Sequence, residues 1–158
     1  MRVLSRCLAL GAGLALLVAI GGTAPAQDKT AVVKDREALM KGQGKSLGVI
    51  KGYIEGKGSQ AQAQTAAVAL TQSIQKIPSV FPPGTDAPSP DGKYAPKPAI
   101  WSDQAGFLAA QKNAAGKADT LAAAVESGDK RAVQTAFADL GKNGCGGCHE
   151  KFRETLKK

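Results

Sequence analysis

The stretch PPGTDAPSPDGKYAPKP, residues 82–98, decides how the rest of the chain folds. Seven of the eight prolines lie within residues 78–98 and the eighth is Pro25, so residues 28–77 and 99–158 contain none. Because proline interrupts helices, the two proline-free halves can form long helices, whereas the quoted stretch is predicted to be a loop. Each half is long enough for a pair of helices.

The composition also favours helices. The 158 residues include 28 alanines and only 4% aromatic residues. Alanine is the strongest helix former, and strands are enriched in aromatic and β-branched residues, so a β-sandwich fits poorly. Hydrophobic residues at 43% and charged residues at 22% are ordinary for one globular domain, which excludes wholesale disorder.

Both halves repeat apolar residues every three or four positions, as amphipathic helices do. Four such helices are predicted: one from about residue 29 to either Tyr53 or Gly56, and three at about residues 59–77, 102–127 and 129–158. Ser59 and Ser102 are expected to cap the second and third helices, and Ser127-Gly128 is expected to end the third. Short turns within each half and a longer crossover between the halves predict an all-α, antiparallel four-helix bundle. No run alternates apolar and polar residues, so no sheet is expected.

The first and last helices carry distinctive residues on their predicted inner faces. The inner face of the first helix is formed by Val33, Arg36, Met40, Leu47, Ile50 and Ile54. The inner face of the last helix is formed by Val133, Phe137, Leu140, Cys145, Cys148, His149, Phe152 and Leu156. An arginine within an apolar stripe suits a buried anionic partner.

Residues 1–26 are predicted to be a cleaved secretory signal peptide, followed by one domain at residues 27–158. The segment begins with two arginines, continues with an apolar run from Leu8 to Ile20, and ends in the cleavage pattern Ala24-Pro25-Ala26. A membrane anchor is the alternative, but the run is short for a span and small and polar residues follow it directly. The sequence therefore predicts export to the periplasm without a stable membrane anchor after cleavage.

Cleavage of the signal peptide would leave few sulfur-containing or imidazole side chains in the mature chain. It removes Cys7 and leaves Cys145 and Cys148 as the cysteines of the mature chain. Met40 becomes its only methionine, and His149 is the only histidine. In an oxidising compartment two cysteines persist only when they are bonded to another group.

The strongest chemical signal is Cys145-Gly-Gly-Cys148-His149. This C-x-x-C-H pattern is the attachment sequence for c-type haem. Two thiols three residues apart on one helix face can each bond a vinyl group of the porphyrin, and the adjacent imidazole then reaches the iron. Gly146 and Gly147 leave room for the porphyrin edge.

Other uses of this motif are weaker. A structural zinc ion needs four protein ligands, and the mature chain offers two cysteines and one histidine. A thioredoxin-type motif expects a βαβ context, which the sequence does not predict. A disulfide would join adjacent helical turns and constrain little.

The chain resembles the class II c-type cytochromes, the cytochrome c′ family of haem-bearing four-helix bundles, and in particular their low-spin Met/His-ligated members. Their C-x-x-C-H motif lies near the C-terminus, as it does here. The resemblance covers about residues 29–158. It rests on the motif followed by Arg153, on Arg36-Glu-Ala-Leu-Met40, on Phe81-Pro-Pro-Gly-Thr85 and on Ile100-Trp-Ser-Asp103. It implies one haem c, covalently bound through two thioethers near the C-terminal helix.

The resemblance also implies roles for single residues. His149 would be the proximal iron ligand, and Arg153, one turn later, would lie beside its imidazole. Arg36 would lie near the haem propionates. Glu37 is a further candidate on the propionate side, although many family members have glutamine there.

Met40 decides the predicted function. In high-spin members of the family an apolar or aromatic side chain covers the distal iron face at this position, whereas in low-spin members a methionine binds the iron. We expect Met40 to bind and the protein to carry single electrons, since His/Met ligation is typical of electron-transfer haems. The alternative is a high-spin cytochrome c′ that binds nitric oxide or carbon monoxide at an open distal site. A peroxidase would need distal acid–base groups and the chain has no second histidine, so no enzyme is expected.

The net charge of +8 becomes +6 after cleavage, because two of the 21 basic residues and none of the 13 acidic ones lie in the signal peptide. The lysines are dispersed and no nucleic-acid motif accompanies them, so nucleic acid is not an expected partner. Unidentified redox partner proteins are expected instead. Gly44, Gly48, Gly52 and Gly56 form a predicted ridge on the first helix, and family members often dimerise through their first two helices, which makes the ridge a candidate homodimer contact.

Overall fold

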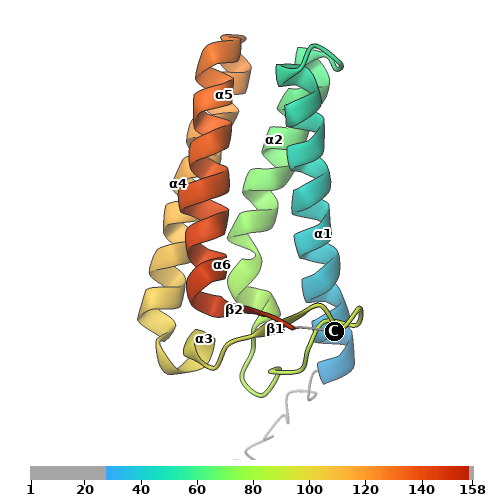
Figure 1. Ribbon diagram of the computed structural model, residues 1–158, viewed down its shortest axis with the longest axis vertical. Helices are drawn as coiled ribbons and strands as arrows, with labels where there is room; N and C mark the ends of the chain where they lie inside the picture. The colour runs from blue at the N-terminus through green and yellow to red at the C-terminus, as the bar shows by residue number, and fades with distance from the viewer. Residues whose placement is uncertain (1–27, 157–158) are drawn as a thin grey trace, which may run out of the picture.

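The computed structural model describes residues 28–156, and the predicted signal peptide lies outside these residues. In the described part, four helical rods stand side by side, which confirms the all-α antiparallel four-helix bundle (Figure 1). The rods are α1 (Lys29–Ile54), α2 (Gln60–Gln75), α4 (Gln104–Ser127) and a last rod made of α5 (Lys130–Asp139), the π-helix η2 (Leu140–Gly146) and α6 (Gly147–Phe152). Within residues 28–156 no helix is both long and apolar enough to cross a membrane.

The two short turns have the capping chemistry that the sequence predicted. The Ser59 hydroxyl accepts a hydrogen bond from the Gln62 amide at 3.2 Å, and the Gln62 side chain accepts one from the Ser59 amide at 3.0 Å. This reciprocal pair satisfies amides that the start of α2 would otherwise leave without partners. Gly128 ends α4 with a φ of 74°, a conformation that favours glycine, and Asp129 caps α5.

The start of the third rod differs from the prediction. Ser102 does not cap it but ends a separate turn, α3 (Ala99–Ser102). The cap is Asp103, whose carboxylate accepts from the Gly106 amide at 3.0 Å. Asp103 leaves the helical conformation at a φ of −121°, so its side chain faces the first amides of α4. The Ser102 hydroxyl instead donates back to the Pro98 carbonyl at 3.3 Å.

The prediction that the last helix continues to residue 158, without any sheet, is wrong. The rod ends at Phe152, and β2 (Arg153–Thr155) pairs antiparallel with β1 (Tyr94–Pro96) from the proline-rich loop. Each strand has three residues, which is too short for a visible alternation, and Pro96 ends β1. The ribbon fastens the loop across the lower end of the bundle (Figure 1). The loop itself begins as a 3₁₀ turn, η1 (Ile77–Val80), which contains Pro78.

The core runs along the bundle axis. Its largest fully buried side chains are Ile50, Leu70, Ile74, Leu121, Val125, Val133 and Leu140. At the lower end, Phe107 on α4 packs edge to face between Phe81 of the loop and Phe152 of α6, with ring centroids 5.3 Å apart in both pairs. These rings join the loop and the last rod to α4.

The predicted glycine ridge is shorter than expected. Gly44, Gly48 and Gly52 lie on an open side of α1, where an added Cβ would meet no atom within 4 Å. Gly56 lies beyond the end of α1 at a φ of 76°. Gly44 also lies at the edge of the large cavity of the structure, so the open ridge comprises Gly48 and Gly52.

The capping of α4 can be tested with Asp103→Ala. This change should lower the free energy of unfolding by about 1 kcal/mol, because the first amides of α4 lose their acceptor. The Asp103–Lys151 ion pair at 2.7 Å is exposed and adds little. Chemical denaturation measures the effect. Ser102→Ala is the matched control, and its free energy of unfolding should stay within about 0.5 kcal/mol of the wild type. A larger loss of stability in Ser102→Ala than in Asp103→Ala would contradict the assignment of the cap.

Candidate haem site

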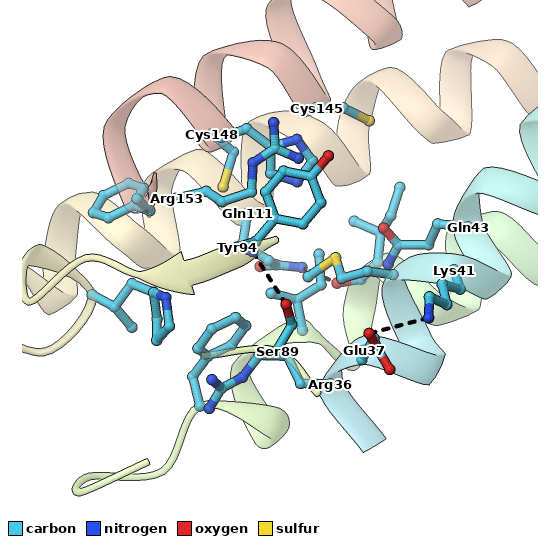
Figure 2. A pocket seen from close by; sticks show the side chains of 18 of the residues that line it. Arg36, Glu37, Lys41, Gln43, Ser89, Tyr94, Gln111, Cys145, Cys148 and Arg153 are labelled. Carbon is cyan, nitrogen blue, oxygen red and sulfur yellow. Dashed lines mark hydrogen bonds and ion pairs between the residues drawn. The ribbon is translucent and has the colours of Figure 1, made fainter. Parts of the chain in front are cut away.

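A cavity of about 340 Å³ lies between the first half of α1 and the end of the last rod (Figure 2). Most of its wall is apolar. The apolar side chains that line it include Val33, Leu47, Ile74, Ile77, Phe81, Ile100, Phe107 and Phe152. The β1–β2 ribbon closes one side through Tyr94, Ala95, Pro96 and Arg153. The cavity is thus enclosed by α1, the end of α2, the loop, α4 and α6.

Cys145, Cys148 and His149 all line this cavity, and each is half-buried. Cys145 lies in η2, whereas Cys148 and His149 lie in α6, and residues three and four apart share one face of a helix. Neither cysteine is in a disulfide. The motif therefore presents two thiols and one imidazole to one apolar space, as the sequence predicted.

Glycines help to position the motif. An added Cβ at Gly144 would lie 2.8 Å from Leu140 Cδ1 and 3.4 Å from the Ala114 Cα on α4. The contact with Leu140, which belongs to η2 itself, would require that side chain to shift, whereas the contact with α4 is an ordinary van der Waals distance. Gly147, between the two cysteines, has no other atom within 4 Å of such a Cβ. The glycines thus allow close packing behind the motif and open space within it.

Burial keeps the three groups of the motif neutral. It raises the pKa of the Cys145 thiol, and it raises the pKa of the Cys148 thiol with a further contribution from Cys145. Burial also lowers the pKa of His149 to about 4, and the positive charge of Arg153 adds to this effect. A neutral imidazole is the form that binds a metal. Arg153 and His149 line the same cavity, and the place of Arg153 beside the imidazole stays a prediction.

Arg36 lines the cavity, and two of its nitrogens donate hydrogen bonds to the loop region. Its Nε donates to the Val80 carbonyl at 3.0 Å, and its Nη2 donates to the Thr85 carbonyl at 2.8 Å and hydroxyl at 2.7 Å. The guanidinium also lies over the Phe81 ring, 4.1 Å from its centroid. Burial lowers the pKa of Arg36 to about 10. Arg36 therefore clasps the loop to α1, and its role at the propionates stays a prediction.

Glu37 and Met40 line the same cavity from α1. The Glu37 carboxylate is paired with the Lys41 ammonium at 3.1 Å, which offsets its negative charge (Figure 2). Its expected contact with the propionates stays a prediction. Met40 is half-buried and packs against the core. Met40 and His149 thus face one cavity from two different rods, while iron binding by Met40 stays a prediction.

The structure adds two residues that the sequence analysis missed. Gln43 on α1 and Gln111 on α4 are each 8% exposed, and both line the cavity. Gln43 follows Met40 by three residues and Arg36 by seven, so helical periodicity places it on the inner face. Because glutamine is polar, the pattern of apolar residues along the first helix does not indicate that Gln43 lies on its inner face.

The residues present fit a c-type haem. The chain supplies two thiols for thioether bonds, one neutral imidazole as an iron ligand, and an apolar cavity with a buried arginine at its edge. A four-helix bundle with this donor set defines a c-type cytochrome of the bundle class.

Comparison with known proteins identifies the family. The family model described as Cytochrome C' matches residues 31–153. Cytochrome c′ of Rubrivivax gelatinosus is 38% identical over 110 residues, covering 68% of this chain and 82% of the relative. Cytochrome c′ of Allochromatium vinosum is 31% identical over 142 residues, covering 89% of each.

The fold agrees with solved members of the same family. The nitric oxide complex of a variant of cytochrome c′ from Alcaligenes xylosoxidans superposes with a TM-score of 0.71 at 26% identity, covering 84% of this chain and 99% of that one. The chain belongs to the cytochrome c′ family and carries one covalently bound haem c.

The attachment chemistry predicts a clear result for cysteine variants. After denaturation, the purified wild-type chain should keep one haem mass, and Cys145→Ser or Cys148→Ser should each keep it through one remaining thioether. The double variant should lose the haem, because no covalent bond is left. Mass spectrometry of the denatured protein measures this. Haem retained by the denatured double variant would show that another residue holds it.

Proposed function

We propose that this cytochrome c′ holds a high-spin haem, with His149 as the single axial protein ligand, and binds nitric oxide or carbon monoxide on the opposite face. The observation that carries the proposal is the match to cytochrome c′ proteins, one of which is similar in fold and is described as a nitric oxide complex. The mostly apolar cavity of about 340 Å³ between α1 and the rod bearing His149 is the space that the haem would occupy. Bound haem supplies an iron with one position open to a gas. Apolar walls suit a small neutral ligand, because they offer few groups that compete for the iron.

The related proteins support this proposal over the electron carrier that the sequence analysis favoured. Structures of the similar cytochrome c′ from Alcaligenes xylosoxidans are nitric oxide complexes of its variants. In this chain Met40 would then pack against the distal face and restrict the space for the gas. An unbranched thioether is well suited to fill such a space and to move aside.

A low-spin electron carrier is the second candidate. One observation favours it: Met40, the only thioether of the predicted mature chain, lines the same cavity as His149. Both candidates leave the redox partner proteins as a prediction. In either case we propose a protein without enzymatic turnover, since no second histidine is present to act as a distal acid or base. Export to the periplasm is part of the proposal and rests on residues 1–26.

Optical spectra of the wild type and of Met40→Leu distinguish the two functions. The proposal predicts high-spin spectra for both, carbon monoxide binding by both reduced proteins, and a changed association rate in the variant, because its distal side chain has a different shape. Val49→Leu, at an exposed position of the same helix, is the matched control and should change nothing. Low-spin spectra in the wild type that become high-spin in Met40→Leu would instead establish iron ligation by Met40.

We also propose that the protein forms a homodimer through α1 and α2. Both helices expose a large apolar side chain, since Val49 is 43% and Val68 is 55% exposed. The open glycines Gly48 and Gly52 would let a second helix approach α1 closely. A related cytochrome c′ of the same fold is described as having a ligand-controlled dimer dissociation.

The dimer proposal predicts that Val68→Glu makes the protein monomeric, because an unpaired charge would be buried in the interface. Sedimentation equilibrium at several protein concentrations measures the association. Leu108→Glu is the control, since Leu108 is also exposed, at 36%, but lies on α4. An unchanged dimer in Val68→Glu, or a monomeric wild type at high concentration, would contradict the proposed interface.

A further inference from the structure

Gln43 has the most unusual environment of the side chains that line the cavity. The residue is only 8% exposed, and its Nε2 is buried without a hydrogen-bond partner. Nearly all buried polar groups in folded proteins have a partner, because an unpaired amide N–H loses its hydration and gains nothing in return. The amide therefore suits an acceptor that enters the cavity.

Three other polar side chains that line the cavity already have partners within the chain. Gln111, the second buried glutamine, donates through Nε2 to the Ile74 carbonyl at 3.1 Å. Arg36 donates to the loop, and Glu37 is paired with Lys41. Among the described residues, the other buried side-chain donor without a partner is the Thr71 hydroxyl on α2, which does not line this cavity.

The position of Gln43 on α1 directs it toward the distal side. Residues three apart on a helix are neighbours on one face, so Gln43 lies one turn beyond Met40. Figure 2 shows Gln43 on the α1 side of the cavity, across from Cys145 and Cys148 on the last rod. If His149 holds the iron from the last rod, α1 would line the opposite, distal side of the haem.

We propose that Gln43 is a distal hydrogen-bond donor, whose Nε2–H binds the outer atom of a diatomic ligand held on the α1 side of the cavity. This inference rests on the proposed gas-binding function and adds a selectivity to it. A donor in an otherwise apolar pocket stabilises a ligand whose outer oxygen carries partial negative charge more than one whose outer atom is neutral. Gln43 thus stabilises the binding of ligands whose outer atom carries a large partial negative charge.

The infrared C–O stretching frequency of the carbon monoxide complex is the direct test. A hydrogen bond to the oxygen draws electron density onto it and lowers the frequency. Gln43→Leu should therefore raise the frequency, and carbon monoxide should dissociate roughly two- to tenfold faster, the range expected for loss of one ordinary hydrogen bond. Gln43→Ala preserves the helix and should shift the frequency in the same direction.

Gln111→Leu is the matched control. It removes an amide from the same cavity, but its Nε2 is already bonded to Ile74, so the frequency should not change. Thermal unfolding of the gas-free holoprotein gives a second readout: Gln43→Leu should raise the midpoint, because it removes an unpaired buried donor, whereas Gln111→Leu should lower it.

The outcomes separate this inference from the function on which it rests. A frequency that rises in both Gln43 variants and stays constant in Gln111→Leu supports the donor. Carbon monoxide binding with an unchanged frequency in the Gln43 variants overturns the donor and leaves the proposed function intact. A reduced wild-type protein that does not bind carbon monoxide overturns both.

Discussion

Cys145, Cys148 and His149 face a single cavity from one helical rod, and many other features of the molecule hold that rod in place. Gly144 leaves room for the Leu140 side chain within η2, the ring of Phe152 packs against Phe107, and β2 fastens the end of the rod to the loop. A haem held by two thioethers and one imidazole tolerates little movement among these three groups. The packing around residues 140–155 therefore positions the site as much as the motif does.

The opposite side of the cavity depends on the clasp made by Arg36. Its hydrogen bonds to Val80 and Thr85 hold the start of the proline-rich loop against α1, and Phe81 packs under the guanidinium. The loop is thus an ordered wall of the site as well as a crossover between helical pairs. The same arginine lines the cavity, and its contact with the acidic groups of the haem stays a prediction.

Much of this arrangement could be predicted from the sequence, because it depends on local signals. Helical periodicity gave the four rods, Ser59 and Gly128 marked the two turns, and C-x-x-C-H identified the cofactor. The remainder depends on long-range contacts. The β1–β2 ribbon joins segments about sixty residues apart through three-residue strands, and the cap at Asp103 depends on one backbone dihedral angle. Gln43 was missed because its importance comes from the lack of a partner, which only packing reveals.

The distal side of the site determines what the protein does, and it consists of few groups. Under the proposed function Met40 would supply bulk without a charge and Gln43 one donor, while apolar side chains form most of the surrounding wall. The crystal structure of the reduced holoprotein, without added gas, tests this account most directly. We predict that the His149 imidazole binds the iron and that the Met40 sulfur lies beyond bonding distance on the other face. A Met40 sulfur bonded to the iron would contradict the account and make the protein an electron carrier.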